Sequence, residues 1–343
     1  MIEKKDRDKR YIKNWWPISL LNLDAKLLSK ALAARLKTVL PTIIKHDQTA
    51  YVANRCLGES VRLISDVLET AELLNLDGYL MTIDIEKAFD SVDHCFLFAA
   101  LEKLGFEQNF VQWIKIMHNK QESCVMNGGN STGYFSLERG SRQGDPISAY
   151  LFIIIMEVFF SMVRNNQSIK GMDILGKKFI LTSYADDTTF FTQDLCSTKE
   201  ILITFDIFSK YSGLSINKSK CEIAGIGTKN GAQVALWDIK CVNLRNESIQ
   251  ILGVHFSYNK QIILETNFTD VVQKIENVVS VWRWRNLTLS GKITIFNSLA
   301  FSKMVFLSFL SNIPAIIIEK LEKIQKYFIW NNKRPKVKHT TLI

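Results

Sequence analysis

Apolar residues recur at helical spacing in several stretches of the chain. Between residues 24 and 40, leucine and alanine side chains lie three or four positions apart, which predicts an amphipathic helix that Pro41 is expected to end. The same spacing predicts helices over residues 58–76, 93–104, 110–117 and 198–211. Residues 147–165 are apolar on nearly all sides and predict a buried helix, and the chain after Thr266 is expected to be mainly helical.

Shorter runs of β-branched and aromatic residues predict strands. These runs are residues 79–85, 179–184, 188–192, 221–226 and 249–254. Only Ala185, Asp186 and Asp187 separate the second run from the third, which predicts a tight hairpin with two acids at its tip. Helices come first, mixed strands and helices follow, and helices end the chain, so the order predicts an α+β fold.

Turn and cap residues mark the ends of several elements. Asp93 is a candidate N-cap, and Gly105 stands where a C-terminal cap belongs. Residues 127–130, Asn-Gly-Gly-Asn, predict a turn between two short strands. Asp145 followed by Pro146 predicts a helix start, because the aspartate can cap and the proline needs no N–H there.

Composition adds size and charge to this picture. The chain has 343 residues, 47% of them apolar, enough for about two or three packed lobes. Its net charge is +9, and the last stretch carries basic residues without an acid: Lys326, Lys333, Arg334, Lys336 and Lys338. A basic surface suits nucleic acid or an acidic membrane, but a solvated surface explains such a run equally simply.

Cysteine usage and hydropathy bear on the compartment. The six cysteines are scattered without a Cys-x-x-Cys pair, which favours reduced thiols inside the cell. The longest apolar run, residues 149–160, is too short to span a bilayer and contains Glu157. The first residues are charged, unlike a signal peptide. We therefore expect an intracellular protein, cytoplasmic or nuclear, without a membrane partner.

The candidate chemistry lies in three acids. Asp84 stands near the end of one predicted strand, and Asp186 and Asp187 stand at the hairpin tip. Nucleotidyl transfer uses two divalent cations about 4 Å apart to clamp the attacking and leaving oxygens. Mg²⁺ suits this task with few carboxylates because it keeps several waters. Taken singly, an Asp-Asp turn or an Asp at a strand end is more often a solvated turn residue.

Motifs around these acids follow one order along nearly the whole chain. They are Asn14–Asn22 with residues 26–36, Asp47–Gln48–Thr49 with Arg55, Asp84–Val92, Arg142–Ser148, Tyr184–Asp187, Gly213–Leu214 with Asn217 and Lys220, Ile251–Val254, Leu287–Lys292 and Phe328–Trp330. In this order they resemble the motifs of reverse transcriptases, and among these the enzymes of non-LTR (LINE-type) retrotransposons. One tetrapeptide would be weak support, whereas the ordered series is specific.

The resemblance implies a right-hand polymerase fold and an activity. Helical fingers would span residues 1–78 and an antiparallel-sheet palm residues 79–260, with a fingers-side insertion at about 106–138. A helical thumb with the basic C-terminal edge would span residues 261–343. The implied activity is RNA-directed DNA polymerisation: an RNA template directs the addition of dNTPs to the 3′-OH of a DNA primer.

The resemblance also implies roles for single residues. Asp84 and Asp186 would ligate two Mg²⁺ ions, with Mn²⁺ as a substitute, supported by Asp187 and the carbonyl of Ile85. The residues implied at the nucleotide are Phe89, Arg142, Gln143, Gly144, Lys220 and, as a fingers lysine, Lys4. Phe89 would lie under the sugar and exclude a 2′-hydroxyl. Those implied at primer and template are Tyr184, Leu252, Gly253, Arg285 and Lys292.

The sequence departs from the family at the fingers. Trp16 stands where an arginine usually clamps the triphosphate, and Glu3 precedes Lys4 in place of a proline. The chain begins near the first fingers motif, so an endonuclease domain would be separate from it. Two alternatives stay open: a catalytically weak or inactive remnant that binds nucleic acid, and a group II intron maturase, against which the LINE-like thumb sequence argues.

Overall fold

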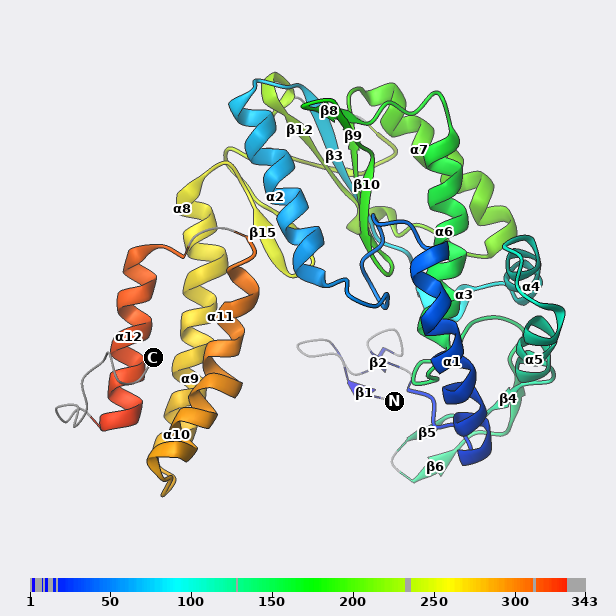
Figure 1. The fold of residues 1–343 in the computed structure, drawn as a ribbon, viewed down its shortest axis with the longest axis horizontal. Helices are drawn as coiled ribbons and strands as arrows, with labels where there is room; N and C mark the ends of the chain where they lie inside the picture. The colour runs from blue at the N-terminus through cyan, green and yellow to red at the C-terminus, as the bar shows by residue number, and fades with distance from the viewer. Residues whose placement is uncertain are drawn as a thin grey trace. The chain divides into compact units, whose positions relative to one another are not determined.

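The computed structural model describes residues 2–3, 8, 10–11, 15–16, 18–127, 129–231, 236–310 and 313–331. The chain divides into two compact units (Figure 1). The first comprises Met1–Leu57, Asp77–Ile223 and Val234–Lys240, and the second comprises Gly58–Leu76, Ala224–Gln233 and Cys241–Ile343. The boundaries of these two units differ from the expected boundaries of fingers, palm and thumb. The expected boundaries stay a prediction.

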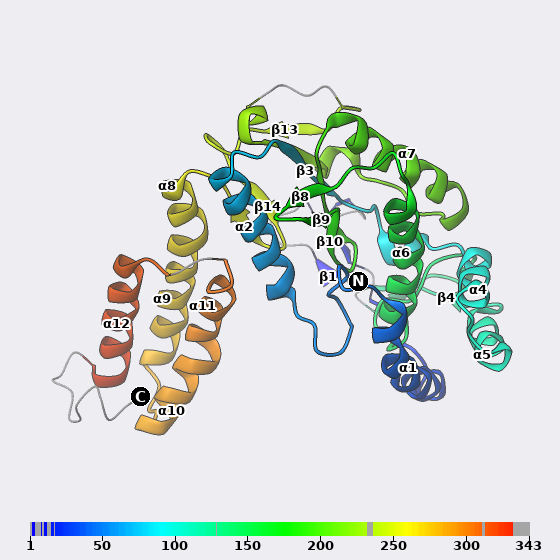
Figure 2. The same ribbon diagram turned by 45° about the horizontal axis from the view of Figure 1, so that its top comes forward.

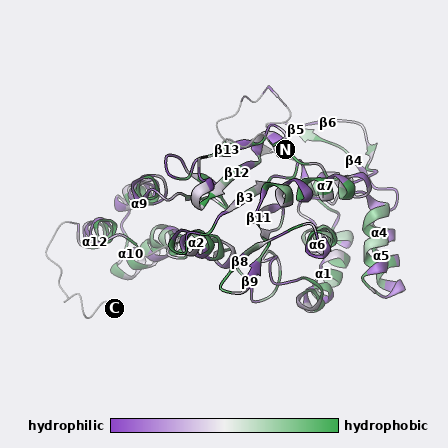
Figure 3. Cartoon of the chain, turned by 90° about the horizontal axis from the view of Figure 1, so that it is seen from above, coloured by the Kyte–Doolittle hydropathy of each residue, from purple (hydrophilic) through white to green (hydrophobic). Residues whose placement is uncertain are grey.

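A five-stranded sheet contributes the first three strands of its order to the first unit. Its order is β10-β11-β3-β12-β13. The strands are β3 (Gly78–Ile83), β10 (Leu181–Tyr184), β11 (Asp187–Thr192), β12 (Glu222–Ile226) and β13 (Lys240–Val242). β11 pairs antiparallel with both β10 and β3, with Tyr184 opposite Asp187 and Thr188 opposite Ile83. Figure 3 shows β3 and β11 side by side. The predicted hairpin and the strand before Asp84 are thus confirmed, although β3 ends at Ile83 instead of Ile85.

The helices of the first unit pack against this sheet and against one another. They are α1 (Leu23–Ile43), α3 (Ala88–Ser91), α4 (His94–Lys103), α5 (Gln108–His118), α6 (Ser148–Asn165) and α7 (Leu195–Ser212). α6 and α7 lie side by side in Figures 1 and 2. The Phe159 ring of α6 lies 6.1 Å from Phe190 of β11 and 5.1 Å from Phe205 of α7. An aromatic core between helices and sheet therefore explains why the 147–165 pattern is apolar all round.

α6 also bears on the membrane question. Ser148–Asn165 is long and apolar enough to cross a bilayer by length and composition, but 61% of it is buried inside the protein. Burial of this kind is typical of a core helix. α6 begins at Ser148, so the expected N-cap at Asp145 is wrong: Ile147 stands at the N-cap position, and the Asp145 carboxylate accepts its N–H at 3.4 Å before the helix starts.

Local capping confirms two predicted helix ends and corrects a third. The Asp93 carboxylate accepts the Phe96 N–H at 2.9 Å, as expected of an N-cap, and Gly105 adopts a φ of 84°. α1, however, does not end at Pro41. It runs through the proline to Ile43. A proline removes one N–H, but it stands so near the end that few bonds of the helix depend on it.

Short hairpins complete the first unit. Their strands are β1 (Ile2–Glu3) with β2 (Trp15–Trp16), β4 (Glu122–Ser123) with β7 (Phe135–Ser136), β5 (Met126–Asn127) with β6 (Asn130–Ser131), and β8 (Met172–Ile174) with β9 (Lys177–Phe179). The β5–β6 pairing confirms the predicted turn over residues 127–130. The run predicted as one strand over residues 179–184 is divided between β9 and β10, because Phe179 pairs with Met172 instead of joining the central sheet.

The second unit is mainly helical. It contains α2 (Leu57–Leu73), α8 (Lys260–Ile263), α9 (Asp270–Arg283), α10 (Leu289–Ile295), α11 (Ser302–Leu307) and α12 (Ala315–Trp330). π-helical turns over Leu264–Thr269 and Phe296–Phe301 join α8 to α9 and α10 to α11. Both hydrophobic and hydrophilic residues colour α9 and α12 in Figure 3, as expected of amphipathic helices packed on one side.

One small hairpin belongs to the second unit and corrects the sequence expectation. Residues 249–254 do not form one strand but fold into β14 (Ile249–Ile251) and β15 (Val254–Phe256). Leu252 and Gly253 make the turn with φ values of 53° and 77°, a left-handed pair typical of two-residue hairpins. The buried Asn267 amide bonds both the N–H and the C=O of His255 at 2.8 Å, so the π-helical turn holds this hairpin.

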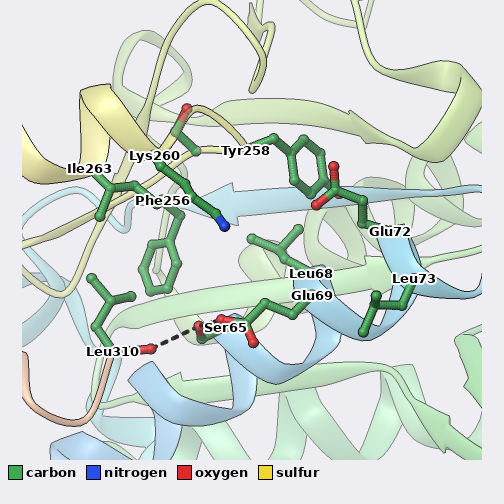
Figure 4. Close-up of a pocket in the computed structure, with 11 residues that line it drawn as sticks. Ser65, Leu68, Glu69, Glu72, Leu73, Phe256, Tyr258, Lys260, Ile263 and Leu310 are labelled. Atoms are coloured by element: carbon green, nitrogen blue, oxygen red, sulfur yellow. Dashed lines mark hydrogen bonds between the residues drawn. The ribbon is translucent and has the colours of Figure 1, made fainter. Parts of the chain in front are cut away.

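A pocket of about 380 Å³ opens within the second unit (Figure 4). It lies between α2 and the segment after β15, and Leu310 closes one side. Ser65 donates to the Leu310 carbonyl at 3.0 Å. Burial, with the charge of Glu72, holds the pKa of Tyr258 well above its usual range. None of Asp84, Asp186 and Asp187 lines this pocket.

His118 on α5 should make the stability of the first unit depend on pH. Its ring is buried and contacts the Ile114 carbonyl through Nδ1 at 2.8 Å. Burial lowers the pKa of His118 to about 4. Below about pH 6.5 the unfolded chain therefore binds a proton at His118, whereas the folded chain binds it only at about pH 4. The free energy of unfolding thus decreases as the pH is lowered from about 6.5 to about 4. Between about pH 7 and about pH 5 we expect His118 to contribute a loss of about 2 kcal/mol.

Urea unfolding of the wild type and of His118→Leu at both pH values measures this contribution. The carboxyl groups titrate in both proteins, so the difference in pH dependence isolates His118. His46→Gln, at an exposed histidine, is the matched control and should keep the wild-type slope. Equal pH slopes in His118→Leu and wild type would contradict the assignment.

Candidate active site

Backbone pairing fixes the position of Asp84, the first acid of the site. Asp84 directly follows β3, and the backbone keeps the direction of the strand beyond it. The Asn217 N–H donates to the Asp84 carbonyl, and the Glu86 N–H donates to the Ser215 carbonyl, each at 2.8 Å. Asp84 therefore carries one ladder bond itself, and a second follows two residues later, so it stands on stiff backbone.

This pairing also sets the direction of the Ile85 carbonyl. Ile85 lies opposite Ile216, and the ladder bonds come from their neighbours. In such a non-hydrogen-bonded antiparallel pair, each residue's own N–H and C=O turn away from the partner strand. The Ile85 carbonyl thus turns toward the side of the strand on which β11 lies.

The loop that pairs with Asp84 also brings a lysine to it. After Asn217, a single 3₁₀ turn over Lys218–Lys220 (η2) directs the chain back toward β12. Lys220 Nζ then lies 3.2 Å and 3.3 Å from the two Asp84 carboxylate oxygens. The lysine is largely exposed, so the pair contributes little to stability but places a positive charge beside the acid.

The β10–β11 hairpin supplies the other two acids. The two residues between the strands are Ala185 and Asp186, and Asp187 is the first residue of β11. The expected tip of three residues is therefore wrong by one, because Asp187 already pairs with Tyr184. Since Thr188 lies opposite Ile83, extending the β3–β11 register by one residue places Asp187 opposite Asp84.

The electrostatics confirm that the three acids share one region. Burial, then the negative charge of Asp84, raises the pKa of the Asp186 carboxyl. Partial burial, then the charges of Asp186 and Asp84, raises the pKa of Asp187 to about 6, although part of the residue stays exposed. Lys220 opposes both shifts. Carboxylates that repel one another in this way favour a cation between them.

The donor set fits a hard divalent cation. Within the described ranges, no group of three His, Cys, Asp or Glu side chains is arranged to enclose an ion. Mg²⁺ does not need such a cage, because it is usually bound by one or two carboxylates and keeps several waters. Asp84, Asp186 and the Ile85 carbonyl are oxygen donors of the right kind near the end of the β3–β11 pair.

The residues expected at the nucleotide also lie in the first unit. The half-buried Phe89 ring packs on Phe152 of α6 with the ring centroids 4.8 Å apart, so the core orients it. The Ser141 N–H donates to the Phe89 carbonyl at 2.6 Å. The loop over residues 139–145 is thereby joined to α3.

Three further residues expected at the nucleotide lie in this loop. The Ser19 N–H donates to the Gln143 carbonyl at 3.0 Å, and the Gln143 side chain bonds Asp90. Gly144 is exposed with a φ of 103°, a conformation that favours glycine. Arg142 is half-buried, and its carbonyl accepts the Asp145 N–H at 3.2 Å.

The structure also brings in a residue that had no expected role at the site. Gln48, which the resemblance places in a fingers motif, bonds the backbone of Ala185 at the hairpin turn. The Tyr184 ring lies 6.4 Å from Tyr51 in the same segment. No local pattern could have signalled these contacts, since more than a hundred residues separate the partners.

The residues expected at primer and template are divided between the units. Tyr184 belongs to the first, whereas Leu252, Gly253, Arg285 and Lys292 belong to the second. The Arg285 guanidinium lies over the Trp282 ring at 4.6 Å. Lys292 donates to the Ile329 carbonyl at 3.3 Å and to Asn331 Oδ1 at 3.1 Å, so it caps the end of α12. Lys4 and the Trp16 side chain lie outside the described part of the chain.

Comparison with known families identifies this arrangement. The family described as reverse transcriptase (RNA-dependent DNA polymerase) matches residues 2–256. The chain belongs to the reverse transcriptase family. The match includes Asp84, the β10–β11 hairpin, the 139–145 loop and the β14–β15 hairpin, and it confirms the resemblance drawn from the motifs.

Related sequences come from transposable elements. The Transposon TX1 uncharacterized 149 kDa protein of Xenopus laevis is 29% identical over 333 residues, which is 96% of this chain and 25% of that protein. The Retrovirus-related Pol polyprotein from type-1 retrotransposable element R2 of Popillia japonica is 26% identical over 230 residues, which is 66% of this chain and 32% of that protein. This chain therefore spans about a quarter to a third of the length of these relatives.

A solved structure of the same fold supports the architecture. The telomerase from Candida tropicalis, determined in complex with a TWJ fragment of telomeric RNA, has a TM-score of 0.51 to this reverse transcriptase chain. The likeness covers 92% of this chain and 48% of that chain, at 12% identity. At this identity the likeness concerns the fold, which is the α+β polymerase fold expected from the motifs.

The contact between α3 and the 139–145 loop can be tested at Gly140. A Cβ added there would lie 2.7 Å from the Asp90 carbonyl oxygen, and its φ is 90°. We expect Gly140→Ala to lower the free energy of unfolding by about 2–5 kcal/mol, from left-handed strain of about 1–2 kcal/mol and overpacking of about 1–3 kcal/mol. Urea unfolding measures the loss.

Gly105 provides the matched control. Its φ of 84° is similarly left-handed, but nothing lies within 4 Å of the added Cβ. Gly105→Ala should therefore lose only the strain of about 1–2 kcal/mol. Equal losses at the two glycines would show that the loop is not packed against α3.

Proposed function

We propose that this chain is an RNA-directed DNA polymerase core that adds deoxynucleotides to the 3′-OH of a primer. The carrying observation is the convergence of Asp84 with Asp186 and Asp187 across the β3–β11 pair, beside Lys220. Membership of the reverse transcriptase family supports the same activity. An RNA template, a DNA primer and dNTPs are the proposed substrates.

The proposed reaction is attack of the primer 3′-oxygen on the α-phosphorus of the dNTP. A P–O bond forms to the primer, the bond to the leaving pyrophosphate breaks, and the proton of the 3′-OH passes to solvent water. Asp84, Asp186 and the Ile85 carbonyl would hold Mg²⁺ or Mn²⁺, with Asp187 in support. When bound, these cations stabilise the charge on the attacking and leaving oxygens.

The residues of the chain contribute position and charge. The Lys220 ammonium, beside Asp84, can neutralise the leaving pyrophosphate or donate a proton to it. Phe89, oriented by Phe152, provides an aromatic surface against the sugar that leaves no room for a 2′-hydroxyl. Arg142, Gln143 and Gly144 would meet the template base and the nucleotide.

We propose that this chain is one part of a longer protein of a transposable element. Its relatives are proteins of transposable elements about two to four times as long, so a separate endonuclease domain is proposed outside this chain. Polymerisation on an RNA template requires cellular dNTPs, and an intracellular location, cytoplasmic or nuclear, remains a prediction. Arg285 and the β14–β15 hairpin are proposed contacts to primer and template. Lys292 is a weaker candidate, because its ammonium already caps α12.

Primer extension on poly(rA)/oligo(dT) with Mg²⁺ tests the activity. We expect the wild type to incorporate dTTP and to stop when EDTA removes the metal. Asp186→Asn keeps the side chain's size but loses the charge, and should lower kcat by more than about 100-fold. Asp206→Asn, at an exposed acid on α7, is the matched control and should retain wild-type activity.

The outcomes separate the enzyme from a remnant. A wild-type chain that is folded yet silent with both Mg²⁺ and Mn²⁺ would refute the polymerase proposal and favour a nucleic-acid-binding remnant. Equal losses in Asp186→Asn and Asp206→Asn would refute the assignment of the acid site.

The departure at Trp16 yields a separate kinetic prediction. An indole cannot donate two parallel bonds to a phosphate as a guanidinium does. If this position meets the triphosphate, Trp16→Arg should lower KM for dTTP with a smaller effect on kcat, because the new contact binds the ground state and the transition state alike. Steady-state extension with varied dTTP measures the change. An unchanged or raised KM would contradict the clamp.

A further inference from the structure

Gln48 is a buried side chain whose hydrogen bonds all go to the acidic hairpin or to its own segment. It has no exposed surface. Its Oε1 accepts the Ala185 N–H at 3.0 Å and the Ala50 N–H at 2.9 Å. Its Nε2 donates to the Ala185 carbonyl at 3.2 Å and to Ser183 Oγ at 3.3 Å. The amide thus uses both donors and two acceptor positions, so it is fully satisfied in one orientation.

Gln48 bonds the backbone of Ala185, the residue whose conformation shapes the turn. Ala185 adopts a φ of 59°, a left-handed conformation that is unfavourable for a residue with a Cβ. Gln48 bonds both its N–H and its C=O, so the strained peptide units have a fixed partner within the protein. Asp186 follows directly, and its backbone direction depends on this turn.

The backbone around Gln48 reinforces the same contact. Gln48 lies opposite Ser183 in a parallel bridge at the outer edge of β10. The Ser183 N–H donates to the Asp47 carbonyl at 2.7 Å, and the Thr49 N–H donates to the Ser183 carbonyl at 2.9 Å. Residues 47–49 therefore act as a short additional strand that covers the edge of the sheet.

Two arginines anchor this short strand. Arg164 of α6 donates to both Asp47 carboxylate oxygens, at 2.8 Å and 2.7 Å, and also to Glu157. Arg55 donates to the carbonyls of Ile44, Lys45 and Gln48. The ion pair between Arg164 and Asp47 thus fixes residues 47–49 to α6, and Gln48 joins the same residues to the β10–β11 hairpin.

We propose that Gln48 is a positioning residue that fixes the Ala185–Asp186 turn and so the direction of the Asp186 carboxylate. This inference rests on the proposed polymerase function for its kinetic consequence, but its structural part does not. Gln48 touches no reacting atom in this account. It acts through the backbone of Ala185, and a misplacement of a catalytic group by about 1 Å can lower a rate by about 100-fold.

Amide hydrogen exchange gives a readout that needs no activity. In the wild type, the Ala185 N–H should be protected by Gln48 Oε1. Gln48→Met fills a similar volume without polar atoms, so exchange in peptides that span residues 184–187 should become faster by at least about tenfold. Gln48→Glu keeps an acceptor for the Ala185 N–H but loses the Nε2 donor, and should show an intermediate effect.

Gln121 supplies the matched control. It is also a buried glutamine, and its Nε2 donates to a backbone carbonyl, that of Met117 at 2.5 Å, but it has no contact with the hairpin. Gln121→Met should leave exchange at residues 184–187 unchanged. If Gln48→Met leaves that exchange unchanged in a folded chain, or if Gln121→Met accelerates it equally, the proposal is overturned.

The kinetic arm distinguishes positioning from general destabilisation. Gln48→Met should lower kcat in primer extension by about 10–100-fold, with KM for dTTP within about threefold of wild type. It should also raise the Mg²⁺ concentration needed for half-maximal rate, whereas Gln121→Met should not. If Gln48→Met does not fold, the same comparison is made with Gln48→Glu. A wild type without activity refutes the polymerase proposal, while exchange still decides the role of Gln48.

Discussion

The antiparallel pairing of β3 with β11 is the constraint on which the site depends. Every residue from Thr188 to Thr192 of β11 is buried, so the core specifies the register strongly. A slip by one residue would turn each side chain to the opposite face and would move Asp187 away from Asp84. The hydrophobic effect thus holds polar groups in place: phenylalanines of β11, α6 and α7 fix a strand whose first residue is an acid.

Electrostatic repulsion is the complementary feature of the site. Asp186 and Asp187 have raised pKa values because they are partly buried beside other negative charges, with Lys220 as a nearby positive group. A protein gains no stability from such an arrangement by itself. The surrounding structure maintains it through bonds from Gln48, through the ladder between residues 84–86 and 215–217, and through the ion pairs of Arg164. Sites that bind cations commonly have this character.

Much of this fold was predictable because its signals are local. Helical periodicity located α1, α2, α6 and α7, and short runs of β-branched and aromatic residues located β3 and β11 around the acids. The wrong details have physical reasons. Asp187 belongs to β11 because it pairs with Tyr184 across the hairpin, although a polar aspartate at this place suggests a turn residue. Residues 249–254 fold back at Leu252, a residue type that rarely adopts a positive φ.

The rest of the site could not be predicted, because it consists of contacts between distant parts of the chain. The bonds from Gln48 to Ala185 span 137 residues, and those from Arg164 to Asp47 span 117. Lys292 makes another contact that no local pattern signals, since its ammonium bonds the end of α12, and its expected role at a phosphate stays a prediction. The family match supports the motif order, whereas the roles of single residues at the nucleotide, primer and template stay predictions.

The central proposal is that Asp84 and Asp186 together hold divalent cations, and iron-mediated cleavage tests it most directly. Fe²⁺ that replaces Mg²⁺ at the site generates short-lived oxidants, which cut the backbone only next to the ion. Mass spectrometry of the fragments should find cuts near residue 84 and near residues 185–187 in the wild type, both suppressed by excess Mg²⁺. Asp186→Asn should weaken the two cuts together. Cleavage at only one of these segments, or loss of one cut without the other, would contradict the account.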